Sequence, residues 1–259
     1  MGVRINTNIE ALNAQRNLGA TSLQFGKSVE KLSSGLRINR AADDAAGLAI
    51  SEKLRAQVRG LNQATRNAQD AISMVQTAEG ALNEVHSMLQ RIRELAVQYA
   101  NGTNDSDSQA SISAEVDQLQ SAISDIAANT KFNGVTLLTG STSVTFQVGA
   151  DSGQTLAVSF ASVDTSGASV SDISSVDAEI VSISTTRGTF GAAQNRLEHT
   201  VASLAVASEN LAASESRIRD LDVANEMVMF TKTQILQQAG TAILAQANQA
   251  PQSVLALLR

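Results

Sequence analysis

Cysteine is absent from this sequence of 259 residues, and histidine, proline and tyrosine are scarce, with two, one and one copies. Without cysteine the chain can form no disulfide, thiolate metal site, iron–sulfur cluster or cysteine nucleophile. His86 and His199 are too few for a histidine-rich zinc or copper site, and no partner motif stands beside either. We expect both histidines to be structural, and we expect no metal, no cofactor and no enzymatic centre.

Aromatic residues make up only 3% of the chain and tryptophan is missing. Compact cores usually contain large aromatic side chains, so the core here must rest on Leu, Ile, Val and Ala. The scarcity of proline favours long uninterrupted helices. A net charge of −6 disfavours a nonspecific nucleic-acid binder, which needs a basic face. No apolar run approaches the ~20 residues that span a bilayer. The first residues carry no apolar signal core, so we expect neither membrane insertion nor a cleavable secretory signal.

A seven-residue repeat dominates the segment 45–99. Positions 54, 61, 68, 75, 82, 89 and 96 carry Leu, Leu, Ala, Val, Leu, Leu and Ala. A second apolar row shifts its register partway, through Val58, Thr65, Ile72, Val85, Ile92 and Tyr99. Such heptads predict a helix that packs side by side with others. One helix over 45–99 would be ~80 Å long, whereas a compact ball of this chain length has a radius of gyration of ~18 Å. The sequence therefore predicts a rod or a part of a larger assembly.

Heptads return from about residue 177, with apolar residues at 183, 190, 197, 204, 211 and 218. Between the two heptad regions, the apolar spacing over 112–126 predicts a shorter helix that folds back after a turn at 101–105. Apolar residues alternate at 144, 146 and 148 and again at 156, 158 and 160, which predicts a β-hairpin. The predicted fold is mainly α: a long antiparallel coiled-coil-like helical rod with a small β-hairpin region and with the N- and C-terminal helices paired.

Helix boundaries are marked by three short polar patterns. Thr7 and Glu10 match a capping box, in which each side chain accepts a free backbone N–H of the first turn. Gly35 predicts the end of this first helix. The pair Asp43 and Asp44 predicts the start of the next helix, because carboxylates suit its N-terminus; a metal site would need more oxygen ligands at fixed spacing.

Both ends of the chain are amphipathic helices with apolar residues left over. A wide apolar face must be buried somewhere, either on the core of the same molecule or on further copies of the chain. The length of the predicted rod favours further copies. The residues that we expect to make these contacts are Ile5, Ile9, Leu12, Leu32, Val228, Ile235, Ile243, Val254, Leu255 and Leu258.

Several long motifs occur in a fixed order from end to end. They read MGVRINTN at 1–8, LSSGLRIN at 32–39, AADDAAGLAI at 41–50, LQRIRELAVQ at 89–98, KFNG at 131–134, SRIRD at 216–220 and ANQAPQSVL at 247–255. Over 1–138 and 178–259 the sequence thereby resembles the bacterial flagellins. Many flagellins carry large variable outer domains in the middle, where this chain has only a short segment, so it resembles a short form of the family.

The resemblance implies a structural subunit of the flagellar filament that serves motility. It implies inner-core terminal helices at 1–42 and 219–259, an outer-core helical bundle at 43–138 and 177–218, and an exposed hairpin and loop region at 139–176. Family members leave the cell unfolded through the flagellar type III apparatus, so the expected location is extracellular, in the filament. The hydroxyls of 139–176 are candidate sites for O-linked sugars; the alternative is an unmodified polar loop.

The resemblance also implies partners. These are further copies of the chain in a helical homopolymer, an export chaperone that holds the C-terminal region, the filament cap and hook-junction proteins, and a host flagellin-sensing Toll-like receptor. The residues that match the receptor-binding positions of flagellins are Gln90, Arg91, Leu95 and Glu115. Arg91 and Leu95 are four residues apart on one helix, so we expect a donor fork beside an exposed apolar anchor.

Two other classes remain open at this point. A hook–filament junction protein shares the terminal helices of flagellins but does not form long filaments alone. A free coiled-coil interaction protein, such as a secretion adaptor, would stay a small discrete oligomer.

Overall fold

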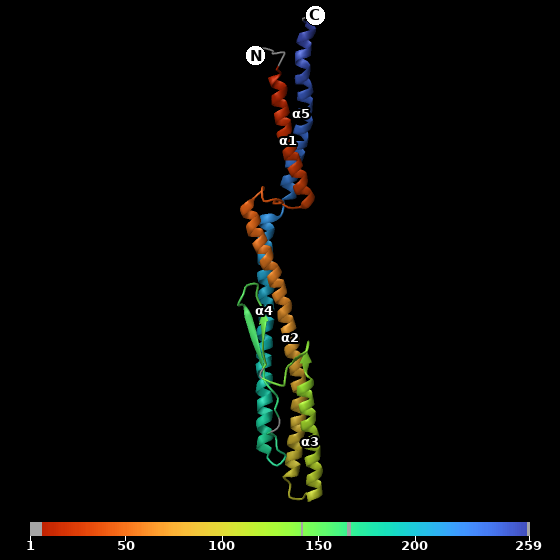
Figure 1. Cartoon of the computed structure of the whole chain (residues 1–259), viewed down its shortest axis with the longest axis vertical. Helices are drawn as coiled ribbons and strands as arrows, with labels where there is room; N and C mark the ends of the chain where they lie inside the picture. Colours follow the sequence, from red (N-terminus) through yellow and green to blue (C-terminus); the bar gives the residue numbers. More distant parts are fainter. Residues whose placement is uncertain (1–6, 141, 165–166, 258–259) are drawn as a thin grey trace. The chain divides into compact units, whose positions relative to one another are not determined.

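The computed structural model describes residues 7–140, 142–164 and 167–257, with side chains up to residue 249. Five helices and two short antiparallel hairpins form within these residues (Figure 1). The elements are α1 (Ile9–Ser34), α2 (Ala45–Tyr99), α3 (Ser106–Asn129), β1 (Lys131–Phe132), β2 (Val135–Thr136), β3 (Thr142–Gln147), β4 (Thr155–Phe160), α4 (Ile173–Arg219) and α5 (Val223–Leu257). The mainly α fold with a small β-hairpin region is confirmed.

The chain divides into two compact units. One, which we call the terminal unit, comprises Met1–Arg55 and Leu211–Arg259; the other, the central unit, comprises Ala56–Asn210. Both boundaries fall inside long helices, α2 and α4. Each unit is described separately below.

The terminal unit consists mainly of α1 and α5, which lie side by side and antiparallel (Figure 1). The amide Nδ2 of Asn8 donates to the carbonyl of Ala247 at 2.7 Å. Farther along, the rings of Phe25 and Phe230 stack with centroids 5.1 Å apart. The predicted pairing of the N- and C-terminal helices is therefore confirmed.

The predicted capping box at the start of α1 is wrong, because the cap lies one residue later. Asn8 has extended backbone angles (φ −88°, ψ 91°), and its side-chain oxygen accepts the N–H of Ala11 at 3.1 Å. With Asn8 as the cap, the third helical residue is Ala11 rather than Glu10, so no carboxylate can reach back. Thr7 lies outside the helix.

The other two boundary predictions are confirmed. Gly35 ends α1 in the left-handed conformation (φ 71°), which glycine adopts without steric cost, and its N–H donates to the carbonyl of Lys31 at 2.9 Å. Asp44 starts α2, because its Oδ1 accepts the N–H of Gly47 at 2.8 Å.

The central unit is built around the heptad seam of α2. Of the predicted row, Leu61, Ala68, Val75, Leu82, Leu89 and Ala96 are buried, whereas Leu54 is only half-buried. The second buried row differs from the prediction, because it runs without a register shift through Ala64, Ala71, Ala78, Val85 and Ile92. Val58, Thr65 and Ile72 are only half-buried. Alanine at the contact lets neighbouring backbones approach closely, so this stretch of the seam buries small rather than large side chains.

Two helices and the larger hairpin cover this seam. The main core joins α2 to Ile112, Val116 and Ile123 of α3, to Val158 and Phe160 of β4, and to Val176, Ile183 and Phe190 of α4. A smaller cluster places Leu156 of the hairpin and Leu197 of α4 against Ala68 and Ala71. The predicted short helix after the 101–105 turn is thus confirmed as α3, capped by Asp105, whose side chain accepts the N–H of Ser108 at 2.9 Å.

The strands follow the predicted alternation. β3 pairs with β4 in antiparallel register, with Val144 opposite Val158 and Phe146 opposite Leu156. The turn signal at Asn133 and Gly134 closes a further small hairpin, β1–β2, with both residues at positive φ (48° and 82°). Helix α4 begins at Ile173, before the expected 177, because Asp172 accepts the N–H of Ser174 at 3.0 Å.

Candidate functional site

The terminal unit carries an apolar surface with little cover. Among its described side chains, Ile38 is the one hydrophobic residue that is buried. On α5, the exposed fractions of Val228, Ile235 and Ile243 are 67%, 59% and 60%. Exposed apolar residues that are grouped in this way are typical of an interaction surface.

A shallow groove follows the start of this face. Its lining residues come from the stretch 227–236 of α5 and are mostly apolar: Met227, Val228, Thr231, Lys232, Ile235 and Leu236. Its single charge is the ammonium group of Lys232. The groove therefore suits apolar contacts and offers no convergent set of groups for chemistry.

The residues expected to make intermolecular contacts fall into three sets. Ile9 and Leu12 are both 52% exposed on α1, in line with the exposed residues of α5. Leu32 is half-buried. Ile5 and Leu258 lie outside the described residues, and Val254 and Leu255 lie in α5 without described side chains.

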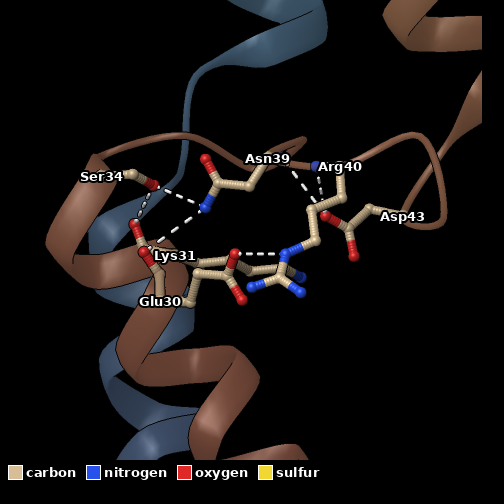
Figure 2. A network of polar contacts seen from close by, with 6 residues as sticks. All are labelled: Glu30, Lys31, Ser34, Asn39, Arg40 and Asp43. Carbon is tan, nitrogen blue, oxygen red and sulfur yellow. Dashed lines mark hydrogen bonds and ion pairs between the residues drawn. The ribbon is translucent and has the colours of Figure 1, made fainter.

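The segment between α1 and α2 is held by a polar network (Figure 2). The Nδ2 of Asn39 donates to Ser34 Oγ at 2.8 Å, and Nε of Arg40 donates to Glu30 at 2.8 Å. The Oδ2 of Asp43 accepts the N–H groups of Asn39 and Arg40 at 3.2 and 3.0 Å. The backbone hydrogen bonds, that from Arg40 foremost, lower the pKa of the Asp43 carboxyl.

A second set of contacts joins this segment to the one between α4 and α5. Leu36 and Asp220 form an isolated antiparallel bridge, and the N–H of Arg37 donates to the carbonyl of Arg219 at 2.7 Å. In return, the N–H of Leu221 donates to the carbonyl of Gly35 at 3.0 Å. Sequence reasoning did not find this contact, because nothing local in either segment indicates the other.

The receptor-matching residues lie on the central unit and are partly engaged with each other. Arg91 Nη2 and Nε donate to Glu115 Oε1 at 2.9 and 3.1 Å, and Nη1 donates to Glu94 at 3.1 Å. The hydrogen bond to Glu115, followed by that to Glu94, raises the pKa of Arg91. Gln90 is exposed, and its Nε2 lies 3.0 Å from Nε2 of His86.

Leu95 differs from the expectation of an exposed apolar anchor. It is only 2% exposed and belongs to the main core of the central unit. The reason is that α3 and α4 both pack on α2, so the buried face is wider than one heptad seam. In the structure of the single chain, Leu95 is therefore not available to a partner, whereas Arg91 and Glu115 are exposed.

The two histidines lie on different helices, His86 on α2 and His199 on α4. His199 is exposed and His86 half-buried. Within the described ranges, no group of three or more His, Asp or Glu side chains is placed to hold a metal ion. None of the helices in the described part of the chain has the length and hydropathy of a membrane-spanning segment.

These features define a structural helical protein with a well-packed central unit and terminal helices that expose apolar faces. The family model for the bacterial flagellin N-terminal helical region matches residues 5–143, and that for the flagellin C-terminal helical region matches 173–258. The chain is 54% identical to the flagellin of Halalkalibacterium halodurans, covering 98% of this chain and 99% of that one. It is 45% identical to the Bacillus subtilis flagellin, covering 99% and 100%. A crystal structure of Bacillus cereus flagellin superposes with a TM-score of 0.50 at 32% identity, over 58% of this chain and 94% of that one.

The chain belongs to the bacterial flagellin family, as a short form. It is a structural subunit of the bacterial flagellar filament. The matches extend over nearly the whole chain, so they do not favour the alternatives of a hook–filament junction protein or a free coiled-coil interaction protein.

Proposed function

We propose that the apolar faces of α1 and α5 are the surface through which copies of this chain pack on one another in the filament core. The observation that carries the proposal is the exposure of Val228, Ile235 and Ile243 on a helix where no hydrophobic residue is buried among the described side chains. Burial of a Val or Ile side chain contributes roughly 1.5–3 kcal/mol. Such contacts offset the entropy of ordering the terminal helices, which is roughly 1–2 kcal/mol per residue for the backbone.

The geometry of such contacts determines which kind of assembly forms. A surface on one end of a copy that packs on a different surface of the next copy is a head-to-tail interface, and head-to-tail interfaces that do not close produce helical filaments. We accordingly assign 1–42 and 219–259 to the inner core, 43–138 and 177–218 to the outer-core bundle, and 139–176 to the exposed region. The expected location is extracellular.

Truncation tests the role of the ends. Removal of residues 1–40 or of 225–259 is expected to leave a soluble helical fragment that does not polymerise, because either deletion removes one helix of the terminal pair. The measurement is electron microscopy of the purified protein after salt-induced assembly. Filaments of normal appearance from either fragment would contradict the inner-core assignment.

Point substitutions test the face itself. The double change Val228→Gln and Ile235→Gln is expected to raise the critical concentration for assembly at least about tenfold, since each lost apolar burial is roughly 1.5–3 kcal/mol. Val206→Gln is the matched control, because Val206 is 58% exposed on α4 of the central unit. Equal effects of the two changes would show that surface hydrophobicity in general, rather than the terminal face, controls assembly.

The proposed partners besides further copies are an export chaperone for the C-terminal region, the filament cap and the hook-junction proteins. All of them follow from family membership. A chaperone fits the exposed apolar residues of α5, since such a face favours aggregation until it is covered.

Recognition by a host flagellin-sensing Toll-like receptor is proposed for the surface of Gln90, Arg91 and Glu115, with Leu95 acting from the core by holding α2 in place. Arg91 presents a planar fork of donors, which suits an interface hot spot.

Arg91→Ala is expected to weaken receptor binding about thirtyfold, the loss typical of a hot spot. Arg66→Ala, an exposed arginine on the same helix, is the control. Equal binding by both variants would remove Arg91 from the recognition site.

A further inference from the structure

The segments that enter and leave the terminal helix pair are fastened to each other. Gly35 and Leu36 follow the last residue of α1, while Asp220 and Leu221 precede the first residue of α5. The two backbone hydrogen bonds that make up the Leu36–Asp220 bridge, 2.7 and 3.0 Å long, hold these segments in register. The points from which α1 and α5 depart are therefore fixed relative to one another.

The side chain of Arg37 reinforces this contact. Its Nε and Nη2 both donate to the carbonyl oxygen of Ile218, at 3.1 and 2.5 Å. Ile218 lies in the last turn of α4, where four carbonyls lack intrahelical donors. A guanidinium there satisfies an otherwise open acceptor and complements the negative end of the helix dipole. The side chain therefore binds one linker to the end of the helix that begins the other.

The linker that carries Arg37 is itself preformed. Figure 2 shows Asn39, Ser34 and Glu30 joined at the end of α1, with Arg40 and Asp43 closing the turn beyond. On the opposite strand of the bridge, Arg219 Nη1 donates to Glu52 of α2 at 2.5 Å. Further polar contacts therefore hold both segments that Arg37 joins, the α1–α2 linker and the end of α4.

The helix pair itself has few features that fix its register. Most apolar side chains of α1 and α5 face outward, and the specific contacts between the two helices include the stack of Phe25 on Phe230, the approach of Leu18 to Gly240 and the Asn8–Ala247 hydrogen bond near their far ends. Because no large apolar side chain of the described part of this pair is fully buried, sliding one helix along the other should cost less here than in the central unit. Since a slide changes which residues form the exposed face, register matters for assembly.

We propose that Arg37 is a positioning residue that sets the register in which α1 and α5 pair. The inference rests on the proposed function only in that register decides which apolar face is presented to the next copy. The contact lies beside the last residue of α1 and the first residue of α5. In this proposal, the pairing of the two helices starts there and extends along them turn by turn.

Disulfide trapping in the full chain reads this register directly. A Cβ built on Gly240 would lie 3.8 Å from Cβ of Leu18, which is the usual separation across a disulfide. The natural chain has no cysteine, so the pair Leu18→Cys and Gly240→Cys gives an unambiguous cross-link. Leu18→Cys with Leu236→Cys is the matched pair displaced by one turn. The quantity measured is the ratio of the two rates of disulfide formation under mild oxidation.

The expected result is a high ratio in the parent chain and a ratio about fivefold lower after Arg37→Ala, the loss typical of one exposed charge-assisted hydrogen bond. Arg37→Lys, which retains the charge without the planar fork, is expected to give an intermediate ratio. Arg217→Ala is the control, because it removes a charge from the same last turn of α4 without touching the linker. Circular dichroism of each variant monitors helix content.

An unchanged ratio after Arg37→Ala would overturn the proposal, and so would an equal decrease after Arg217→Ala, because general helix-end charge would then explain the effect. If circular dichroism showed that Arg37→Ala had lost its helices, Arg37→Lys would serve as the test in its place. A disulfide ratio in Arg37→Lys equal to that of the parent chain would contradict a role for the guanidinium fork. The ratio is read in the monomer, so it tests the register separately from filament formation, which the truncations test.

Discussion

The terminal and central units place similar residues in opposite surroundings. In α4, Ile183, Phe190 and Leu197 recur at intervals of seven and are buried in the central unit. In α5, Val228 and Ile235 have the same spacing and are largely exposed. The difference lies in the packing: the residues of α4 share a core with α2, α3 and a hairpin, whereas the main neighbour of α5 among the described residues is α1.

This comparison shows that a heptad pattern indicates that a helix packs against another helix. The pattern does not indicate whether that helix belongs to the same chain or to another copy. In the central unit this packing is completed within the molecule. In the terminal unit it is not completed by the described residues, which is the expected condition of a subunit whose ends become buried on assembly.

The largest expected effect is on the central core. Phe190→Ala removes a 1% exposed ring that packs against Phe160, with centroids 5.3 Å apart. Replacing a buried aromatic side chain by alanine costs about 3–5 kcal/mol of unfolding free energy. Leu23→Ala, at a 74% exposed site of α1, is expected to change it by less than about 0.5 kcal/mol. Chemical denaturation followed by circular dichroism measures both, and similar losses would mean that the two units do not differ in packing.

A smaller effect is expected at a tightly packed point of the terminal unit, the start of α2. A Cβ on Gly47 would lie 2.8 Å from Cγ of Asp44 and 2.9 Å from Cδ1 of Ile38. Gly47→Ala therefore displaces both the α2 cap and the buried Ile38, at a cost typical of overpacking, about 1–3 kcal/mol. Faster hydrogen exchange over residues 36–50 is the expected signal, with unchanged exchange over 82–95. Gly80→Ala, where a Cβ meets nothing within 4 Å, is the control.

Acid is expected to act on the central unit through its helix caps. The side-chain and backbone hydrogen bonds from Ser108 lower the pKa of Asp105, and those from Ser174 lower the pKa of Asp172. A carboxyl whose folded pKa lies below its unfolded value stabilises the fold above the unfolded value and loses this contribution as pH falls through the folded one. The denaturant concentration at the unfolding midpoint should therefore decrease as the pH is lowered from about 5 to about 3.

The double variant Asp105→Ala and Asp172→Ala provides the check. Its midpoint should start lower at neutral pH and decrease less on acidification, because the titrating caps are gone. A decrease as large as that of the parent chain would place the acid sensitivity elsewhere.

The smallest expected effect is at the exposed ion pair of Arg91 and Glu115. Both side chains are about half exposed, so water and salt screen their attraction. Glu115→Gln is expected to leave the denaturation midpoint of the central unit within experimental error at physiological salt. A clear loss of stability would show that the pair holds α3 on α2, and that the receptor proposal must be separated from a folding role.

Much of the central unit could be predicted because its large apolar residues recur at helical and strand periods. The seam from Leu61 to Ala96, the turn into α3 and the β3–β4 hairpin all followed from spacing alone. The alanine row through Ala64 and Ala71 was missed, because alanine occurs equally on buried and exposed helix faces. The burial of Leu95 was missed because it depends on two further helices that pack on α2.

The candidate surfaces could be predicted less completely. The apolar residues of α1 and α5 were identifiable, yet only the structure shows which of them lie outward, since that depends on how the two helices meet. The contact of Arg37 with the end of α4 joins residues 181 positions apart. No periodicity or local motif encodes such a contact.

The central claim is that the terminal helices receive their cover from neighbouring copies. Hydrogen exchange, measured on the monomer and on the assembled filament, tests it most directly. In the monomer, amides of residues 9–30 and 224–249 should exchange much faster than those of 82–95, and in the filament all three segments should be protected to a similar degree. Protection of the terminal segments in the monomer equal to that of 82–95 would contradict the account.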